Sequence, residues 1–253
     1  MEGRLVLENP AVLVWVLLFF GMAGSVMGSF ACCYVHRYVK DESVIRGRSV
    51  CDQCGHVLGV WDLVPLISYL CLRGRCRYCG HKISSASFWA EVLCAGVFMI
   101  LGYRFGVTMR TFQYMILAVL LVIVSFVDLS VYIIPDCCIL GMLVNWAMFL
   151  PLQENWIAML PGSLFASVFL YCILYSLSKI VSYFLKQESI GGGDLKLLWI
   201  MGLYLGVWRA WMALLISCFT GMLFVCLMRR QRIPFGPSLA IGMGIMMLAS
   251  DLL

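Results

Sequence analysis

The chain has few charged residues for its length. Asp, Glu, Lys and Arg make up 12% of its 253 residues, whereas hydrophobic residues make up 63%. A soluble domain usually carries about a quarter charged residues. One water-soluble core cannot enclose this much apolar surface. The composition therefore excludes a soluble globular protein and predicts an integral membrane protein surrounded by lipid.

Histidine is scarcer still. The three histidines, His36, His56 and His81, lie in or beside a single polar stretch, and the rest of the chain has none. No convincing serine–histidine arrangement for nucleophilic catalysis can therefore be built. The net charge of +5 is modest. It reflects mainly the basic residues that set membrane orientation, so we expect no nucleic-acid partner.

Long apolar runs recur along the whole chain. Those long enough to cross a bilayer, or nearly so, cover residues 11–35, 87–103, 111–127, 137–150, 160–183, 210–228 and 235–253. A run at 197–207 is shorter than the roughly 20 residues of a perpendicular span, and we expect a partial or tilted helix there. The first run lacks the basic start and cleavage site of a signal peptide, so we expect it to be retained. The sequence predicts an all-α polytopic membrane bundle of about eight transmembrane segments.

Basic residues predict the orientation of the bundle. If residues 36–86 lie in the cytoplasm and the spans alternate from there, only Arg4, Arg104, Arg110 and Arg209 fall outside. Cytoplasmic loops carry an excess of Lys and Arg, so this asymmetry favours an external amino terminus.

Two cysteine pairs lie in the one sizeable polar region. They are Cys51-Asp52-Gln53-Cys54 and Cys76-Arg77-Tyr78-Cys79, and each is followed by Gly-His. Two such pairs supply four thiolates for a tetrahedral Zn²⁺. Two disulfides or free thiols are the alternatives, and a reducing cytoplasm disfavours disulfides. A bound metal would provide much of the folding energy of so small a loop.

Two aspartates lie at the edges of apolar runs. Asp128 follows a run that we expect to end as a helix there, and Asp194 closes the sequence Gly191-Gly192-Gly193-Asp194. Ionisable side chains at membrane depth are rare and usually mark a functional site. On the predicted topology both lie at the cytoplasmic face. If they converge, they form the catalytic acid pair of an aspartyl protease.

Neighbouring residues are expected to support this pair. A proline should start the next helix, which places Asp136 in its first turn as a capping or supporting residue. Gly191 and Gly193 allow close packing around Asp194. By itself, however, Gly-Gly-Gly-Asp also fits a flexible linker with a helix-capping aspartate. Lys196 either offsets nearby charge or extends to the membrane interface.

The chemistry of such a pair needs no serine or cysteine nucleophile. Two carboxyl groups close together cannot easily both ionise, so they share a proton. The ionised group takes a proton from the attacking water. The protonated group hydrogen-bonds to the peptide carbonyl and later helps to protonate the leaving amine.

Taken together, these motifs resemble the type IV prepilin peptidases over nearly the full length. The matching segments are Gly24 to Gly28-Ser29-Phe30, the two cysteine pairs, Trp61 to Leu70, Arg73 to Cys79, Asp128 to Asp136, Gly191 to Asp194 with Lys196, and Ile233-Pro234-Phe235-Gly236-Pro237. Members of that family often have proline at the position of Asp52.

The resemblance implies a bifunctional enzyme of the bacterial inner membrane, serving type IV pili or type II secretion. Such enzymes remove short, positively charged leader peptides from prepilins and pseudopilins, with Asp128 and Asp194 as the matching catalytic acids. They then methylate the new amino terminus with S-adenosylmethionine. The cysteine loop is associated with methylation, and Glu91 matches an acidic position just beyond it.

The resemblance also implies a division of the chain. Residues 1–35 would form the first transmembrane helix, 36–86 the cytoplasmic Cys-rich loop, and 87–253 the protease core. Three other functions stay open. They are a peptidase without methylation, an ion-coupled transporter that uses the intramembrane aspartates, and a non-enzymatic assembly factor. The sequence has no clear internal repeat and no acid near mid-membrane, which argues against the transporter.

Overall fold

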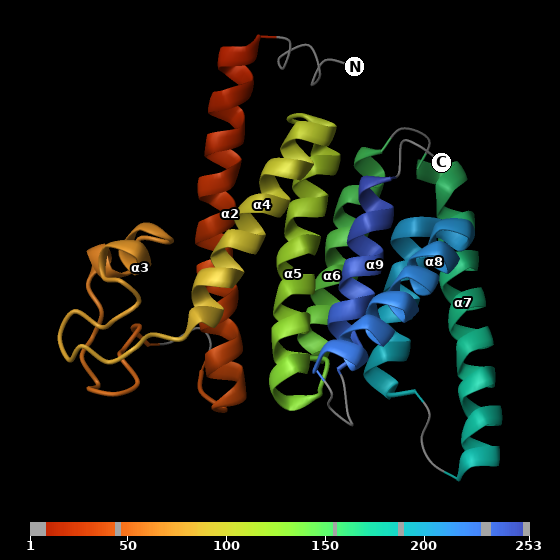
Figure 1. Ribbon diagram of the computed structural model, residues 1–253. Helices are drawn as coiled ribbons and strands as arrows, with labels where there is room; N and C mark the ends of the chain where they lie inside the picture. The colour runs from red at the N-terminus through yellow and green to blue at the C-terminus, as the bar shows by residue number, and fades with distance from the viewer. Residues whose placement is uncertain (1–8, 44–46, 154–155, 187–189, 229–233, 250–253) are drawn as a thin grey trace. The chain divides into compact units, whose positions relative to one another are not determined.

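The structure, a computed structural model, describes residues 9–43, 47–153, 156–186, 190–228 and 234–249. Within these ranges the chain is helical and forms no extended strand (Figure 1). The expected all-α class is confirmed. Predictions on Arg4 and Ile233 lie outside the described residues. The chain divides into two compact units, Met1–Ile123 and Val124–Leu253, with the boundary inside one helix.

In the first unit, α2 (Pro10–Val39) packs along α4 (Ser85–Phe105). The side chain of Asn9 caps α2 by accepting the N–H of Ala11 at 3.0 Å. Two glycines of α2 bring the helices together. A Cβ on Gly24 would lie 2.8 Å from Cα of Ala95, and one on Gly28 would lie 2.7 Å from Cα of Glu91. Small residues four apart allow this close approach between membrane helices.

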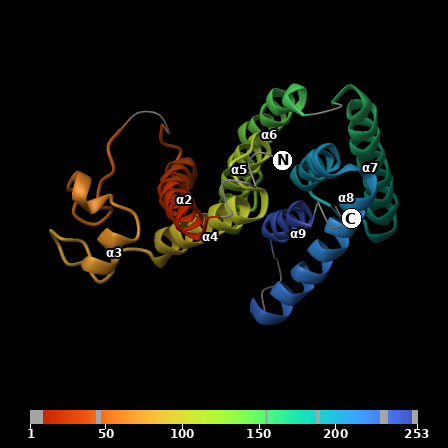
Figure 2. The same cartoon turned by 90° about the horizontal axis from the view of Figure 1, so that it is seen from above.

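The segment between α2 and α4 carries little regular structure. It contains the short helices η1 (Val60–Asp62) and α3 (Ile67–Cys71). Isolated antiparallel bridges join Val50 to Val57 and Arg75 to Lys82, one beside each cysteine pair. Figure 2 shows this segment to one side of α2 and α4.

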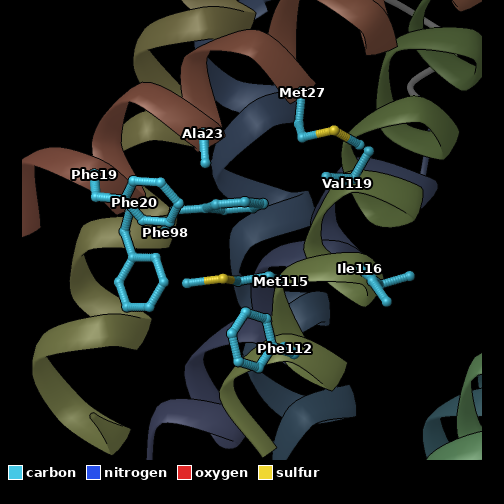
Figure 3. A pocket seen from close by; sticks show the side chains of 9 residues that line it. All are labelled: Phe19, Phe20, Ala23, Met27, Phe98, Phe112, Met115, Ile116 and Val119. Carbon is cyan, nitrogen blue, oxygen red and sulfur yellow. The ribbon is translucent and has the colours of Figure 1, made fainter. Parts of the chain in front are cut away.

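An apolar pocket of about 310 Å³ lies in the first unit between α2, α4 and the early part of α5 (Met109–Val131) (Figure 3). Its lining consists of apolar side chains, including Phe20, Phe98 and Met115. It has no group that could act as an acid, base or nucleophile.

The second unit contains α6 (Asp136–Phe149), η2 (Leu150–Leu152), α7 (Trp156–Leu185), α8 (Gly192–Met228) and α9 (Gly236–Leu248). The Tyr204 hydroxyl of α8 donates to the carbonyl of Met142 at 2.8 Å and accepts from Nδ2 of Asn145 at 2.9 Å, which fixes α6 against α8. A Cβ on Gly202 would lie 2.6 Å from Cα of Ser167 on α7. Residues of α8 thus hold it against both α6 and α7.

In the part of the chain that the structure describes, five helices are long and apolar enough to cross a membrane, so the protein is an integral membrane protein. They are α2, α4, α5, α7 and α8, while α6 and α9 are shorter apolar helices. Helix α8 is interrupted at Gly206, whose φ of 72° and ψ of 176° are not helical. This break lies near the end of the apolar run expected at 197–207, shortly before the run expected at 210–228. The count of about eight spans stays a prediction.

Candidate functional site

Asp128 lies in the last turn of α5, because that helix continues to Val131. The expectation that the helix ends at Asp128 was therefore wrong by about one turn. The residue is buried, with 5% of its surface exposed. Its Oδ2 accepts a 2.8 Å hydrogen bond from the N–H of Gly236, the first residue of α9. The amino end of α9 thus stabilises a carboxylate that the end of α5 disfavours.

Asp194 is the third residue of α8 and is half-buried. Its carboxylate accepts a hydrogen bond from the backbone N–H of Gly191, the residue just before the helix. An acid at this position that reaches back to the capping residue is one half of a capping box. Gly191 and Gly193 flank a helix start here, so the flexible-linker alternative is not what the chain forms.

Two contacts join the start of α8 to the loop that leads into α6. A Cβ on Gly193 would lie only 3.0 Å from Cβ of Ile134. The Nζ of Lys196 donates to Oδ1 of Asp136 at 2.6 Å. Asp136 is the first residue of α6, directly after Pro135, so it lies in the first turn as expected. Lys196 therefore offsets the charge of Asp136.

These contacts bring the two candidate acids close together. Asp128 on α5 and Asp194 on α8 lie near enough for their charges to interact electrostatically. Both belong to the second unit. Each carboxylate also lies beside the amino end of a helix and accepts one backbone N–H. Two carboxyl groups that share a proton can activate a water molecule, which is the chemistry expected of this pair.

Gly236 is a site residue that the sequence reasoning missed. Its motif was noted only for its resemblance, with no role assigned. A Cβ at this position would lie 2.7 Å from Oδ2 of Asp128. The signal in the sequence was a glycine directly followed by Pro237, because proline is favoured in the first turn of a helix.

The four cysteines of the two pairs converge. The Sγ atoms of Cys51, Cys54, Cys76 and Cys79 all lie within 4.8 Å of one another. Four sulfurs at about 2.3 Å from a tetrahedral Zn²⁺ would be about 3.8 Å apart. The sulfurs of Cys51 and Cys79 are separated by 3.9 Å. The donor set therefore fits a zinc ion.

The two cysteine turns have the same backbone design. The N–H of Cys51 donates to the carbonyl of His56 at 2.9 Å, and that of Cys76 donates to the carbonyl of His81 at 2.8 Å. The glycine after each pair has a positive φ, 69° at Gly55 and 70° at Gly80. Backbone hydrogen bonds from Cys54 and Gln53 lower the pKa of Cys51 to about 7. The backbone of the first turn therefore favours the thiolate of Cys51, the form that a metal requires.

A second missed residue, Asp62, joins the two halves of the cysteine segment. Its Oδ1 lies 2.8 Å from Nε of Arg77, and its Oδ2 accepts from the hydroxyl of Tyr78 at 3.2 Å and the N–H of Gly59 at 3.1 Å. Arg77 and Tyr78 belong to the second cysteine turn. Asp62 therefore fixes the connecting segment against that turn.

Asp52 joins the first cysteine turn to the end of α2. Its Oδ1 lies 2.7 Å from Nζ of Lys40 and 3.1 Å from Nε2 of His36. The hydrogen bond from Lys40 lowers the pKa of Asp52.

Glu91, expected to belong to the methylation half, is buried on α4. Its Oε2 accepts a 2.7 Å hydrogen bond from the N–H of Leu66. Leu66 has a φ of 60°, a conformation that non-glycine residues rarely adopt. Glu91 thus holds the cysteine segment at a strained turn and lies outside the acid pair.

Comparison with known proteins gives consistent matches. The bacterial peptidase A24 N-terminal domain matches residues 22–105, and the type IV leader peptidase family matches residues 115–226. The prepilin leader peptidase/N-methyltransferase of Bacillus subtilis (strain 168) is 31% identical over 236 residues, which cover 90% of each chain. No solved structure matches this chain.

Two Pseudomonas proteins with the same name are similar to the chain. That of Pseudomonas putida is 32% identical over 219 residues, covering 80% of this chain and 72% of the relative. That of Pseudomonas aeruginosa is 30% identical over 220 residues, covering 83% and 74%. With a relative above 30% identity matched along nine-tenths of its length, this chain belongs to the type IV leader peptidase family.

Proposed function

We propose that this protein cleaves the leader peptide from prepilins or pseudopilins and methylates the amino terminus that cleavage exposes. The observation that carries the peptidase activity is the proximity of two acids, Asp128 and Asp194, on different helices of one compact unit. Relatives named for both activities support the pairing of cleavage with methylation.

Asp128 and Asp194 act together on one water molecule in this proposal. One carboxylate removes a proton from the water molecule. The oxygen of that water attacks the scissile carbonyl carbon. The other carboxyl group donates a hydrogen bond to the carbonyl oxygen, and a proton then passes to the leaving amine as the carbon–nitrogen bond breaks. The N–H groups of Gly236 and Gly191 orient the two carboxylates.

The supporting residues maintain this geometry without touching the peptide. Gly193 allows the start of α8 to approach Ile134. The ion pair between Lys196 and Asp136 fixes the same two segments at a second point. Gly191 supplies the N–H that the Asp194 carboxylate accepts.

The cysteine segment serves methylation, with Cys51, Cys54, Cys76 and Cys79 holding a structural zinc ion. Four thiolates fill a tetrahedral site and leave no open position for a catalytic water. The methyl donor is S-adenosylmethionine, whose sulfonium group supplies the methyl group to the new amine. Glu91 contributes by fixing the segment at Leu66.

The proposed location is the bacterial inner membrane, with the acid pair at the cytoplasmic face. Basic residues gather on the same side as the cysteine segment under this topology. The hydrophobic part of a prepilin would approach within the bilayer while its charged leader stays in the cytoplasm. Residues 1–35, 36–86 and 87–253 then act as first helix, methylation loop and protease core.

Purified protein incubated with a prepilin tests the proposal. Asp128→Asn and Asp194→Asn should each lower leader removal by at least about 100-fold, the usual minimum contribution of a general acid or base. Asp52→Asn is the matched control, because this acid lies in the cysteine segment and pairs with Lys40. It should cleave at the wild-type rate. Mass spectrometry of the product's first residue reports cut position and methylation together.

Wild-type cleavage by either acid variant would refute the assignment of the pair. A wild-type protein that transports ions but leaves the prepilin intact would support the transporter instead. All variants must first be found inserted in the membrane at wild-type levels, so that loss of cleavage reflects chemistry.

A further inference from the structure

The cysteine segment carries large apolar side chains that face away from the protein. On η1, Val60 is 80% exposed and Trp61 78%. On the neighbouring helix α3, Ile67 is 62% exposed and Leu70 63%. We call these four residues the apolar patch. Apolar groups concentrated in this way on a polar segment mark a site for a membrane or a protein.

Packing on α4 determines which side of α3 faces outward. Tyr69 stacks on Phe88 of α4 with ring centroids 4.9 Å apart, and Glu91 holds the N–H of Leu66. Ile67 and Leu70 are three residues apart and so lie on one face of the helix. Tyr69 therefore faces α4, whereas the aliphatic side chains of Ile67 and Leu70 face outward. In a helix that packs on a protein core and faces water, the aliphatic side chains would face the core instead.

The same segment carries exposed basic residues. Arg73 and Arg75 follow α3 directly, and both are exposed, as are Arg48 and Lys82. Of the four acids described in residues 36–86, Asp52 pairs with Lys40 and Asp62 with Arg77, while Asp41 and Glu42 follow the end of α2. The segment consequently presents apolar groups within a cationic surface, a combination suited to anionic lipid headgroups.

The segment is also held next to a bilayer at both ends. It leaves α2 and enters α4, two helices that can cross the membrane. In Figure 1, α3 lies beside α2, level with its turns, and Figure 2 shows α3 to one side of both α2 and α4. Tethering at two points keeps the local concentration of membrane surface high.

We propose that residues 60–70 dock onto the membrane surface, with the apolar patch inserted at the boundary between headgroups and acyl chains. Trp61 lies at the depth where tryptophan is enriched in membrane proteins. Arg73 and Arg75 contact anionic headgroups. A lipid surface accounts for both the apolar and the basic residues, whereas a protein partner would need to be acidic and apolar at the same place. This inference requires only membrane insertion and does not depend on peptidase activity.

Tryptophan fluorescence of the full-length protein in vesicles tests the docking. The chain has eight tryptophans, so the emission of Trp61 is obtained by subtracting the spectrum of Trp61→Phe from that of the wild type. Vesicles of phosphatidylcholine and phosphatidylglycerol are compared with matched vesicles that contain lipids brominated on the acyl chains. Trp15→Phe isolates a reference tryptophan that is exposed on α2 within a candidate span.

Docking predicts that brominated lipids quench most of the Trp61 emission and that this emission lies at shorter wavelength than for tryptophan in water. Arg73→Gln and Arg75→Gln should each weaken docking in the anionic vesicles by about fivefold, the contribution of one basic residue near such a surface. Quenching of Trp61 should also fall in vesicles of phosphatidylcholine alone.

Unquenched emission at the wavelength of tryptophan in water would overturn the proposal. Emission protected from an aqueous quencher, yet unaffected by brominated lipid, would also overturn it and would assign the patch to a protein partner. Equal quenching in neutral and anionic vesicles would overturn the role of anionic lipid. Quenching of Trp15 in the same vesicles shows that the reporter works.

Discussion

A carboxylate in the last turn of a helix faces the negative end of the helix dipole. Asp128 is in this position on α5, and the residue that compensates for it is a glycine 108 positions away. Gly236 contributes an N–H and leaves room for the carboxylate, so it has both an electrostatic and a steric role. Any side chain at this position would enter the space that Asp128 occupies.

Gly236→Ala should therefore lower kcat/KM for leader removal by about 10- to 100-fold, the effect of displacing a reacting group by about an ångström. The new Cβ would lie 2.7 Å from Oδ2 of Asp128. Gly244→Ala is a matched control on the same helix, because a Cβ there meets nothing within 4 Å. Alanine also favours a helix more than glycine does, so a weaker helix would not explain the loss. Wild-type cleavage by Gly236→Ala would contradict the steric role.

At the scale of elements, the contact between the cysteine segment and α4 depends on one buried acid. Glu91 accepts the N–H of Leu66, whose positive φ gives that N–H its direction. Tyr69 and Phe88 add an aromatic stack at the same junction. The segment is thus attached to the membrane helices by specific side chains, in addition to its covalent ends.

Glu91→Gln and Glu91→Leu separate positioning from charge. Glutamine keeps a carbonyl oxygen that can accept the N–H of Leu66, so segment order and methylation should both survive. Leucine leaves that N–H unsatisfied, which should destabilise the docked segment by about 1–3 kcal/mol. Limited proteolysis at Arg73 and Arg75, together with amino-terminal methylation, measures the two effects. Loss of methylation in Glu91→Gln with an intact segment would show that the charge itself is needed.

How far the sequence predicts these elements depends on the range of the interactions. Apolar runs predict the helices, and cysteine spacing predicts the convergence of Cys51, Cys54, Cys76 and Cys79, because both patterns are local. Spacing could not reveal the contact of Gly236 with Asp128, which requires packing across 108 positions. The helix end at Val131 was missed because an acid was taken as a stop signal, whereas tertiary contact stabilises it inside the last turn.

For the whole molecule, the division into two units separates the two proposed chemistries. The cysteine segment and Glu91 lie in Met1–Ile123, while Asp128 and Asp194 lie in Val124–Leu253. Each unit has its own internal contacts, such as Gly28 against α4 in the first and Tyr204 against α6 in the second. The backbone N–H groups that the two acids accept, those of Gly236 and Gly191, also belong to the second unit.

Removal of the metal should consequently abolish one activity and spare the other. Cys51→Ser with Cys54→Ser deletes two of the four sulfurs, and structural zinc sites provide about 10–16 kcal/mol of apparent binding energy in small peptides. We expect loss of bound zinc, faster tryptic cleavage at Arg73 and Arg75, and loss of methylation. Leader removal should continue at nearly the wild-type rate.

Cys218→Ser is the matched control, because Cys218 lies on α8 and outside the cysteine cluster. This variant should retain the metal and both activities. If the double variant stays inserted but no longer cleaves, the segment supports the acid pair and the two units do not function independently.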